Sequence, residues 1–121
     1  MDLLASVLVA IVGLLHLWFL VLEMVLWQRP LGLRTFGLTP GFAHESATLA
    51  ANQGLYNGFL AVGLLLTLVA PRPTAFHGQL FLLSCVIVAG LFGAATVSRR
   101  ILFVQALPAA LALVVVLVAA N

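Results

Sequence analysis

The sequence predicts an all-α integral membrane protein, an antiparallel up-down four-helix bundle with both termini on the non-cytoplasmic side. Four apolar runs fill almost the whole chain of 121 residues, which is 64% hydrophobic and only 7% charged. A soluble domain of this length would need a far more polar surface. The runs do not alternate polar with apolar residues, so membrane-spanning strands are not expected.

Each apolar run is long enough to cross a membrane as a helix, because a hydrocarbon core of ~30 Å needs roughly 20 helical residues. The expected helices cover about residues 3–27, 42–70, 76–98 and 101–120, all within a single domain, 1–121. Residues 1–4 carry no positive charge before the first apolar run. We therefore expect a retained helix rather than a cleaved signal peptide.

The three connections differ in length. The first, from Gln28 to Ala43, is long, and its helix breakers are Pro30, Gly32, Gly37, Pro40 and Gly41. Because proline suits the first helical position, Thr39 is expected to cap a helix that begins at Pro40. The second connection, residues 71–73, ends the preceding helix sharply with its two prolines. The third, residues 98–100, is so short that the last two helices form a tight antiparallel hairpin.

Arginine placement sets the expected orientation. The first and third connections lie on one side and hold Arg29, Arg34, Arg99 and Arg100, whereas the other side holds only Arg72. The positive-inside rule puts the four-arginine side in the cytoplasm. Both termini then lie outside, and the lipid bilayer is the expected environment of the chain.

Small residues predict close helix contacts. Gly54 and Gly58 form a GxxxG pair in the second apolar run. A similar stripe in the third run consists of Ala89, Gly93 and Val97, with Gly90 and Ala94 beside it. Each stripe is expected to face a neighbouring helix rather than lipid.

Polar residues inside the apolar runs mark the candidate site. A polar side chain in hydrocarbon costs several kcal/mol unless it meets a partner or a wet cavity. Counting helical rises from the expected cytoplasmic ends puts Glu23, Asn52 and Gln105 at a similar depth, ~7–10 Å inside. The pattern predicts a ligand pocket that opens to the cytoplasm. Its candidate residues are His16, Glu23, Asn52, Gln53, Tyr56, Asn57, Arg99 and Gln105.

Depth matching also suggests contacts within this pocket. His16 and Glu23 are seven residues apart and so share one helix face. Asn52 is expected near Glu23, and Asn57 near His16. Arg99 or Arg100 is the expected cationic partner of Glu23.

Simpler interpretations remain open for each group. Asn, Gln, Tyr and His often fasten membrane helices together, at ~0.6 kcal/mol per interhelical hydrogen bond. His16 with Glu23 lacks the ligand number of a metal centre, so no metal is expected. Cys85 is a lone thiol in an apolar run, which favours a buried structural role. With no lysine and a net charge of +2, the chain gives no support for nucleic-acid binding.

Several segments resemble a known family. These are residues 16–24, 36–40, 51–58 with the string Asn-Gln-Gly-Leu-Tyr-Asn-Gly at 52–58, and 93–99. They resemble bacterial membrane proteins grouped as domain of unknown function 1304, and the resemblance covers nearly the whole chain. It implies a small four-helix membrane protein, with no established activity to carry over.

A weaker likeness is to the membrane-associated eicosanoid and glutathione metabolism proteins. Those proteins have four helices, outside termini and a polar second helix. Their second helix typically has Arg-Ala, then Asn, then Glu, whereas here Ala51-Asn52 leads to Tyr56 and Asn57. The likeness implies only the architecture, including a trimer. The homo-oligomer that we consider for this chain is a dimer or a trimer.

Three functions are compatible with the sequence. The first is a membrane protein, such as a carrier, that binds a small or amphipathic ligand, with Glu23 and His16 as titratable groups. The second is an intramembrane transferase, with Tyr56 as acid and Arg99 as anion clamp. The third is a structural subunit whose polar groups only fasten helices. No cofactor is indicated, and the expected location is the bacterial inner membrane, as a multi-pass protein.

Overall fold

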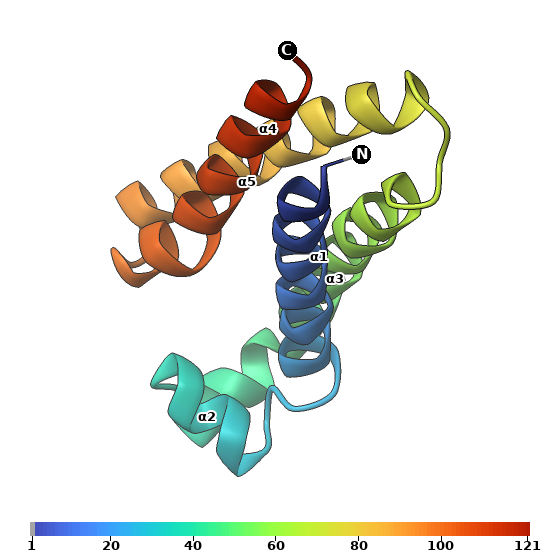
Figure 1. The fold of residues 1–121 in the computed structure, drawn as a ribbon. Helices are drawn as coiled ribbons and strands as arrows, with labels where there is room; N and C mark the ends of the chain where they lie inside the picture. Colours follow the sequence, from blue (N-terminus) through green and yellow to red (C-terminus); the bar gives the residue numbers. More distant parts are fainter. Residues whose placement is uncertain (1) are drawn as a thin grey trace. The chain divides into compact units, whose positions relative to one another are not determined.

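The computed structural model describes residues 2–121, and in that range the chain is entirely helical apart from its connections (Figure 1). Its elements are α1 (Leu3–Met24), α2 (Pro30–Phe36), α3 (Pro40–Thr67), α4 (Thr74–Thr96), η1 (Leu102–Ala106) and α5 (Leu107–Ala119). Four spans are long and apolar enough to cross a membrane: α1, α3, α4 and η1 continued by α5. The predicted all-α fold with four membrane-spanning helices is confirmed.

The first connection contains a helix that the sequence did not predict. Pro30 and Gly37, interpreted above as breakers, instead bound the short helix α2. Pro30 occupies its first turn, and Gly37 ends it in the left-handed region with φ 64°. The expected cap at Thr39 is observed, because the backbone N–H of Phe42 donates to Thr39 Oγ1 at 3.2 Å.

The connection packs against the end of α1. A Cβ on Gly32 would lie 1.9 Å from the carbonyl oxygen of Leu26, so only glycine permits this approach. The Trp27 ring lies 5.0 Å from that of Phe36, and its Nε1 donates to Ser46 Oγ at 3.0 Å. Trp27 therefore joins the end of α1 to α2 and α3.

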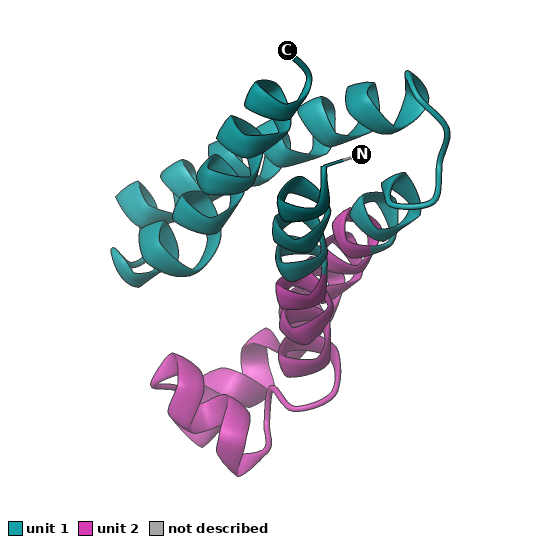
Figure 2. Cartoon of the chain, viewed as in Figure 1, with its two compact units in different colours: residues 1–13, 62–121 teal, residues 14–61 magenta. Residues whose placement is uncertain are grey.

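The chain forms two compact units, residues 1–13 with 62–121 (unit 1) and residues 14–61 (unit 2) (Figure 2). In unit 2, a Cβ on Gly54 would lie 2.6 Å from Met24 Cγ and 3.3 Å from the Leu20 carbonyl oxygen. A Cβ on Gly58 would lie 2.6 Å from Leu20 Cδ1. The predicted Gly54–Gly58 contact is thus observed, and its register makes α1 and α3 antiparallel.

Unit 1 is built on the hairpin of α4 with η1 and α5. A Cβ on Gly90 would lie 2.7–2.9 Å from three atoms of Ala106, two of them backbone. A Cβ on Gly93 would lie 3.0 Å from Ile101 Cγ2. The predicted hairpin is therefore observed, but the closest contact between its two helices, which we call the seam, is at Gly90. Ala89 and Val97, placed in the expected stripe, are exposed.

The unit also joins the end of α3 to the start of α4. A Cβ on Gly63 would lie 2.8 Å from Leu82 Cδ1, and one on Gly78 would lie 3.0 Å from Thr67 Cγ2. This register makes α3 and α4 antiparallel, as are α1 with α3 and α4 with α5. Each of these pairs of successive helices is antiparallel within its own unit, as the sequence predicted.

The last span begins with a π-helical turn, η1, in which the N–H of Leu107 donates to the carbonyl of Leu102. Pro108 follows immediately and explains this wide turn. The ring of Pro108 leaves no room for the carbonyl of residue 104, and its nitrogen carries no N–H to donate. The regular α-helical hydrogen bond between these two residues therefore cannot form. Gln105 lies within the π-helical turn and is half-buried.

We expect Gly90→Ala to destabilise the protein by about 1–3 kcal/mol, because the new methyl group meets rigid backbone at Ala106. Gly41→Ala is the matched control, since a Cβ there meets nothing within 4 Å. Thermal unfolding in detergent measures both. Equal unfolding temperatures for the two variants would contradict the assigned seam.

Candidate functional site

The candidate site is centred on a hydrogen bond between two membrane-spanning helices. The side-chain amide of Asn57, on α3, donates to Glu23 Oε1, on α1. Asn57 is 7% exposed and Glu23 is half-buried. A carboxyl group within an apolar helix requires such a partner, because hydrocarbon offers it no hydrogen bond.

The glycine contact brings these two side chains together. Leu20 fills the space above Gly58 and approaches Gly54, so the backbones of α1 and α3 lie close. Asn57 precedes Gly58, and Glu23 is one turn beyond Leu20 on α1. The short amide side chain of Asn57 therefore reaches the carboxyl group across the helix interface.

This pairing corrects the predicted one. Depth matching predicted that Asn52 would contact Glu23 and that Asn57 would contact His16. In the structure, Asn57 forms the hydrogen bond with Glu23, and Asn52 is exposed. The error has a physical cause. Register between two helices is set by which side chains interlock, here Leu20 with Gly54 and Gly58, and not by counted distance from the membrane surface.

His16 lies on the same face of α1 as Glu23, as predicted from their spacing of seven residues. Its side chain is 0% exposed, and its ring meets that of Phe19 edge to face at 5.0 Å. The buried face of α1 thus carries an imidazole and a carboxyl group two turns apart.

The remaining polar residues of α3 lie away from this centre. Asn52, Gln53 and Tyr56 are exposed, with Tyr56 at 57%. Asn52 is five residues from Asn57, which places it about 140° away around the helix. On α3, the structure therefore separates the buried Asn57 from an exposed group of predicted residues.

Arg99 and Gln105 belong to the other unit, near the turn between α4 and α5. Arg99 is exposed and Gln105 is half-buried. The ion pair of Glu23 with Arg99 or Arg100 stays a prediction. Cys85, expected to be buried, is a half-buried free thiol.

Sequence reasoning missed one buried polar link. Gln79 is 2% exposed, and its side-chain amide donates to Thr67 Oγ1 at 3.2 Å. The Thr67 hydroxyl donates in turn to the Leu64 carbonyl at 2.6 Å. The rule that selected Asn52 also applied to Gln79, a lone amide in an apolar run, so the signal was present. Within residues 2–121, no buried side-chain nitrogen or oxygen lacks a hydrogen-bond partner.

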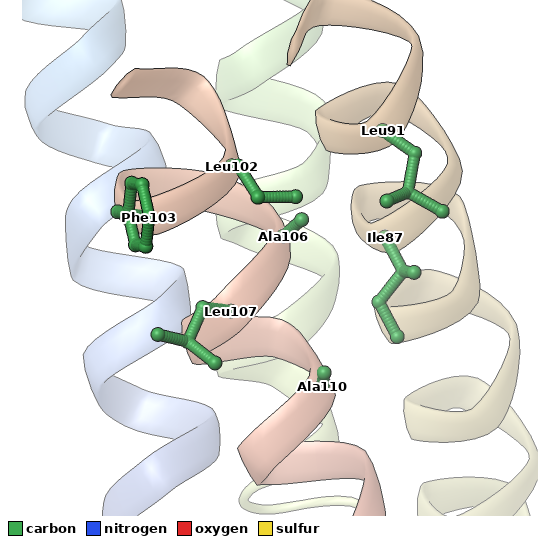
Figure 3. Close-up of a pocket in the computed structure, with 7 residues that line it drawn as sticks. All are labelled: Ile87, Leu91, Leu102, Phe103, Ala106, Leu107 and Ala110. Atoms are coloured by element: carbon green, nitrogen blue, oxygen red, sulfur yellow. The ribbon is translucent and has the colours of Figure 1, made fainter. Parts of the chain in front are cut away.

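A hollow of about 260 Å³ opens along the hairpin of α4 with η1 and α5 (Figure 3). Apolar side chains alone line it, among them Leu91, Leu102 and Leu107. It carries none of the predicted polar residues, so it suits an acyl chain or an apolar side chain. Within the described residues, no group of three His, Cys, Asp or Glu side chains is placed to hold a metal ion.

Four apolar spans and polar pairs between helices define a small multi-pass membrane protein. The family model described as "Protein of unknown function (DUF1304)" matches residues 10–117, and the chain belongs to this family. The match includes every candidate site residue. No curated protein and no solved structure gives a significant match.

We expect Glu23→Leu and Asn57→Leu to be energetically coupled, because each removes one partner of the same bond. A double-mutant cycle on the free energy of unfolding in detergent should give a coupling energy of about 0.5–2 kcal/mol. Asn52→Leu replaces Asn57→Leu in the control cycle and should be additive with Glu23→Leu. Additivity in both cycles would show that the bond contributes nothing measurable.

Proposed function

We propose that the protein binds a small amphipathic ligand within the membrane, at the Glu23 carboxyl group. The Glu23–Asn57 hydrogen bond carries this proposal. A carboxylate has about four acceptor positions, and the bond to Asn57 occupies one of them. The carboxyl group is half-buried, so acceptor capacity remains for a ligand that enters beside α1 and α3.

The chemistry of the site limits the class of ligand that it can bind. The centre consists of a carboxyl group and an amide, and a buried imidazole lies two turns away on the same face of α1. Such a set favours a hydrogen-bond donor or a positive charge joined to an apolar body that remains in lipid. His16 and Glu23 are the titratable groups that a proton-coupled carrier would use.

A structural function is the second candidate, and the Gln79–Thr67 link favours it. That link fastens α3 to α4 with a fully buried amide, so this chain uses polar pairs for packing. Glu23 and Asn57 would then be another such fastener. By contrast, the transferase alternative assigned the acid to Tyr56, which is exposed and lies about 100° around α3 from Asn57.

Whether the purified protein retains a ligand distinguishes the ligand-binding function from the structural function. Native mass spectrometry of gently purified protein should show a bound small molecule on the wild type that Glu23→Gln loses, with its unfolding temperature little changed. Glu45→Gln, which alters an exposed carboxyl group, is the matched control and should keep the adduct. An adduct retained equally by both variants, or a wild type without any adduct, would leave the fastening function as the explanation.

We further propose that the protein lies in the bacterial inner membrane with both termini outside the cytoplasm. The positive-inside rule supports this proposal, because four of the five arginines lie in the first and third connections, which alternating helices put on one side of a membrane. Alkaline phosphatase fused after Asn121 should therefore be active in a bacterial host, and a fluorescent protein fused there should be dark. The reverse pair of results would invert the topology.

A further inference from the structure

The apolar hollow along the hairpin is built entirely within unit 1. Its lining on the last span runs from Leu102 to Ala110, and α4 provides the other wall (Figure 3). Its floor is Ala106, which is 4% exposed because Gly90 lets the backbone of α4 approach it. The hollow is therefore a groove between two helices with an entirely apolar lining, and we call it the hairpin groove.

Contacts within unit 1 determine the side of α4 on which the hairpin groove lies. Leu82 is the residue of α4 that a Cβ on Gly63 of α3 would meet. The groove residues of α4, Ile87 and Leu91, are five and nine residues from Leu82, which places them about 140° and 180° away around the helix. The hairpin groove therefore lies on the side of α4 that faces away from its contact with α3.

The length of the hairpin groove matches one leaflet of a membrane. From Leu102 to Ala110 the lining covers eight residues, or ~12 Å of helix. Half of a hydrocarbon core of ~30 Å is ~15 Å. The groove begins one turn after Arg99, whose carbonyl accepts a hydrogen bond from the N–H of Leu102 at 3.0 Å. An alkyl chain that starts at this turn would lie in the groove over most of one leaflet.

Two positive charges lie at the start of the hairpin groove. Arg99 and Arg100 are both exposed in the turn that precedes η1. The single acidic residue of unit 1, Asp2, lines a different hollow together with Val115. Val115 is 15 residues from Arg100, or ~22 Å along the helix. Because guanidinium groups bind phosphate through paired, charge-assisted hydrogen bonds, the turn suits a phosphate that comes from outside unit 1.

We infer that the hairpin groove binds a membrane phospholipid with a net negative headgroup, with one acyl chain between α4 and α5 and the phosphate at Arg99 and Arg100. An acyl chain is the apolar body that suits an uncharged groove of about 260 Å³ in hydrocarbon. The phosphate accounts for the arginine pair as well as the groove, which an apolar helix from another protein does not. The inference does not depend on the proposed function, because Glu23 and Asn57 belong to unit 2.

Lipid titration followed by native mass spectrometry tests the headgroup. Delipidated protein in detergent should bind dioleoylphosphatidylglycerol about tenfold more tightly than dioleoylphosphatidylcholine, which has the same acyl chains but a compensating ammonium group. Arg99→Gln with Arg100→Gln should abolish this preference. Arg29→Gln with Arg34→Gln changes two exposed arginines of unit 2 and is the matched control, which should keep the preference. Equal affinity of the wild type for the two lipids, or an equal loss in both double variants, would overturn the inference.

A second pair of variants tests the hairpin groove itself. Ala110→Phe places a ring in the groove and should weaken the binding of dioleoylphosphatidylglycerol severalfold. Leu111→Phe places a ring at the neighbouring exposed position, outside the groove lining, and should bind the lipid as the wild type does. Unfolding temperatures check that both variants are folded. Unchanged affinity in Ala110→Phe would overturn the inference, as would a lipid-free dimer in which a second copy occupies the groove.

The same titration separates this inference from the proposed function. Glu23→Gln should bind dioleoylphosphatidylglycerol as the wild type does, because the carboxyl group lies outside unit 1. The mass of the added lipid distinguishes its adduct from the ligand proposed for Glu23. Failure of lipid binding and failure of the proposed function are therefore separate results.

Discussion

The close contact of Leu20 with Gly54 and Gly58 is the constraint on which the candidate site depends. Without a Cβ at these glycines, α1 and α3 approach until Leu20 Cδ1 fills the space that a Gly58 side chain would need. That approach brings the short Asn57 amide within reach of Glu23. A carboxyl group in an apolar helix is then kept in the protein interior by one hydrogen bond rather than exposed to lipid.

Unit 1 is also held together by a close contact at a glycine and by a buried polar link between helices. Gly90 lets α4 approach the backbone of Ala106, and the Gln79–Thr67 link ties α4 to α3. Because lipid provides no hydrophobic driving force between helices, small residues and buried hydrogen bonds must supply the specificity of packing. Glu23 differs from these fasteners in two respects. It is ionisable and only half-buried, which leaves its carboxyl group capacity to meet a ligand.

Composition and spacing predicted the parts of this structure that follow from one helix at a time. The apolar runs predicted the four spans, GxxxG predicted the contact at Gly54 and Gly58, and Thr39 was correctly identified as a cap. The predictions that were wrong concerned features that depend on two segments of the chain together. The partner of Glu23 follows from interlocking side chains on α1 and α3, and the π-helical turn follows from Pro108 and its packing context. Helix α2 was missed because its proline and glycine were interpreted as breakers rather than as its ends.

Disulfide trapping of the α1–α3 register is the most direct test of the central claim. In a Cys85→Ser background, the pair Glu23→Cys with Asn57→Cys should cross-link within one chain under mild oxidation. Glu23→Cys with Asn52→Cys should not, because Asn52 lies about 140° away from Asn57 around α3. Preferential cross-linking of the second pair would mean that Asn57 does not face Glu23, and the site would have to be abandoned.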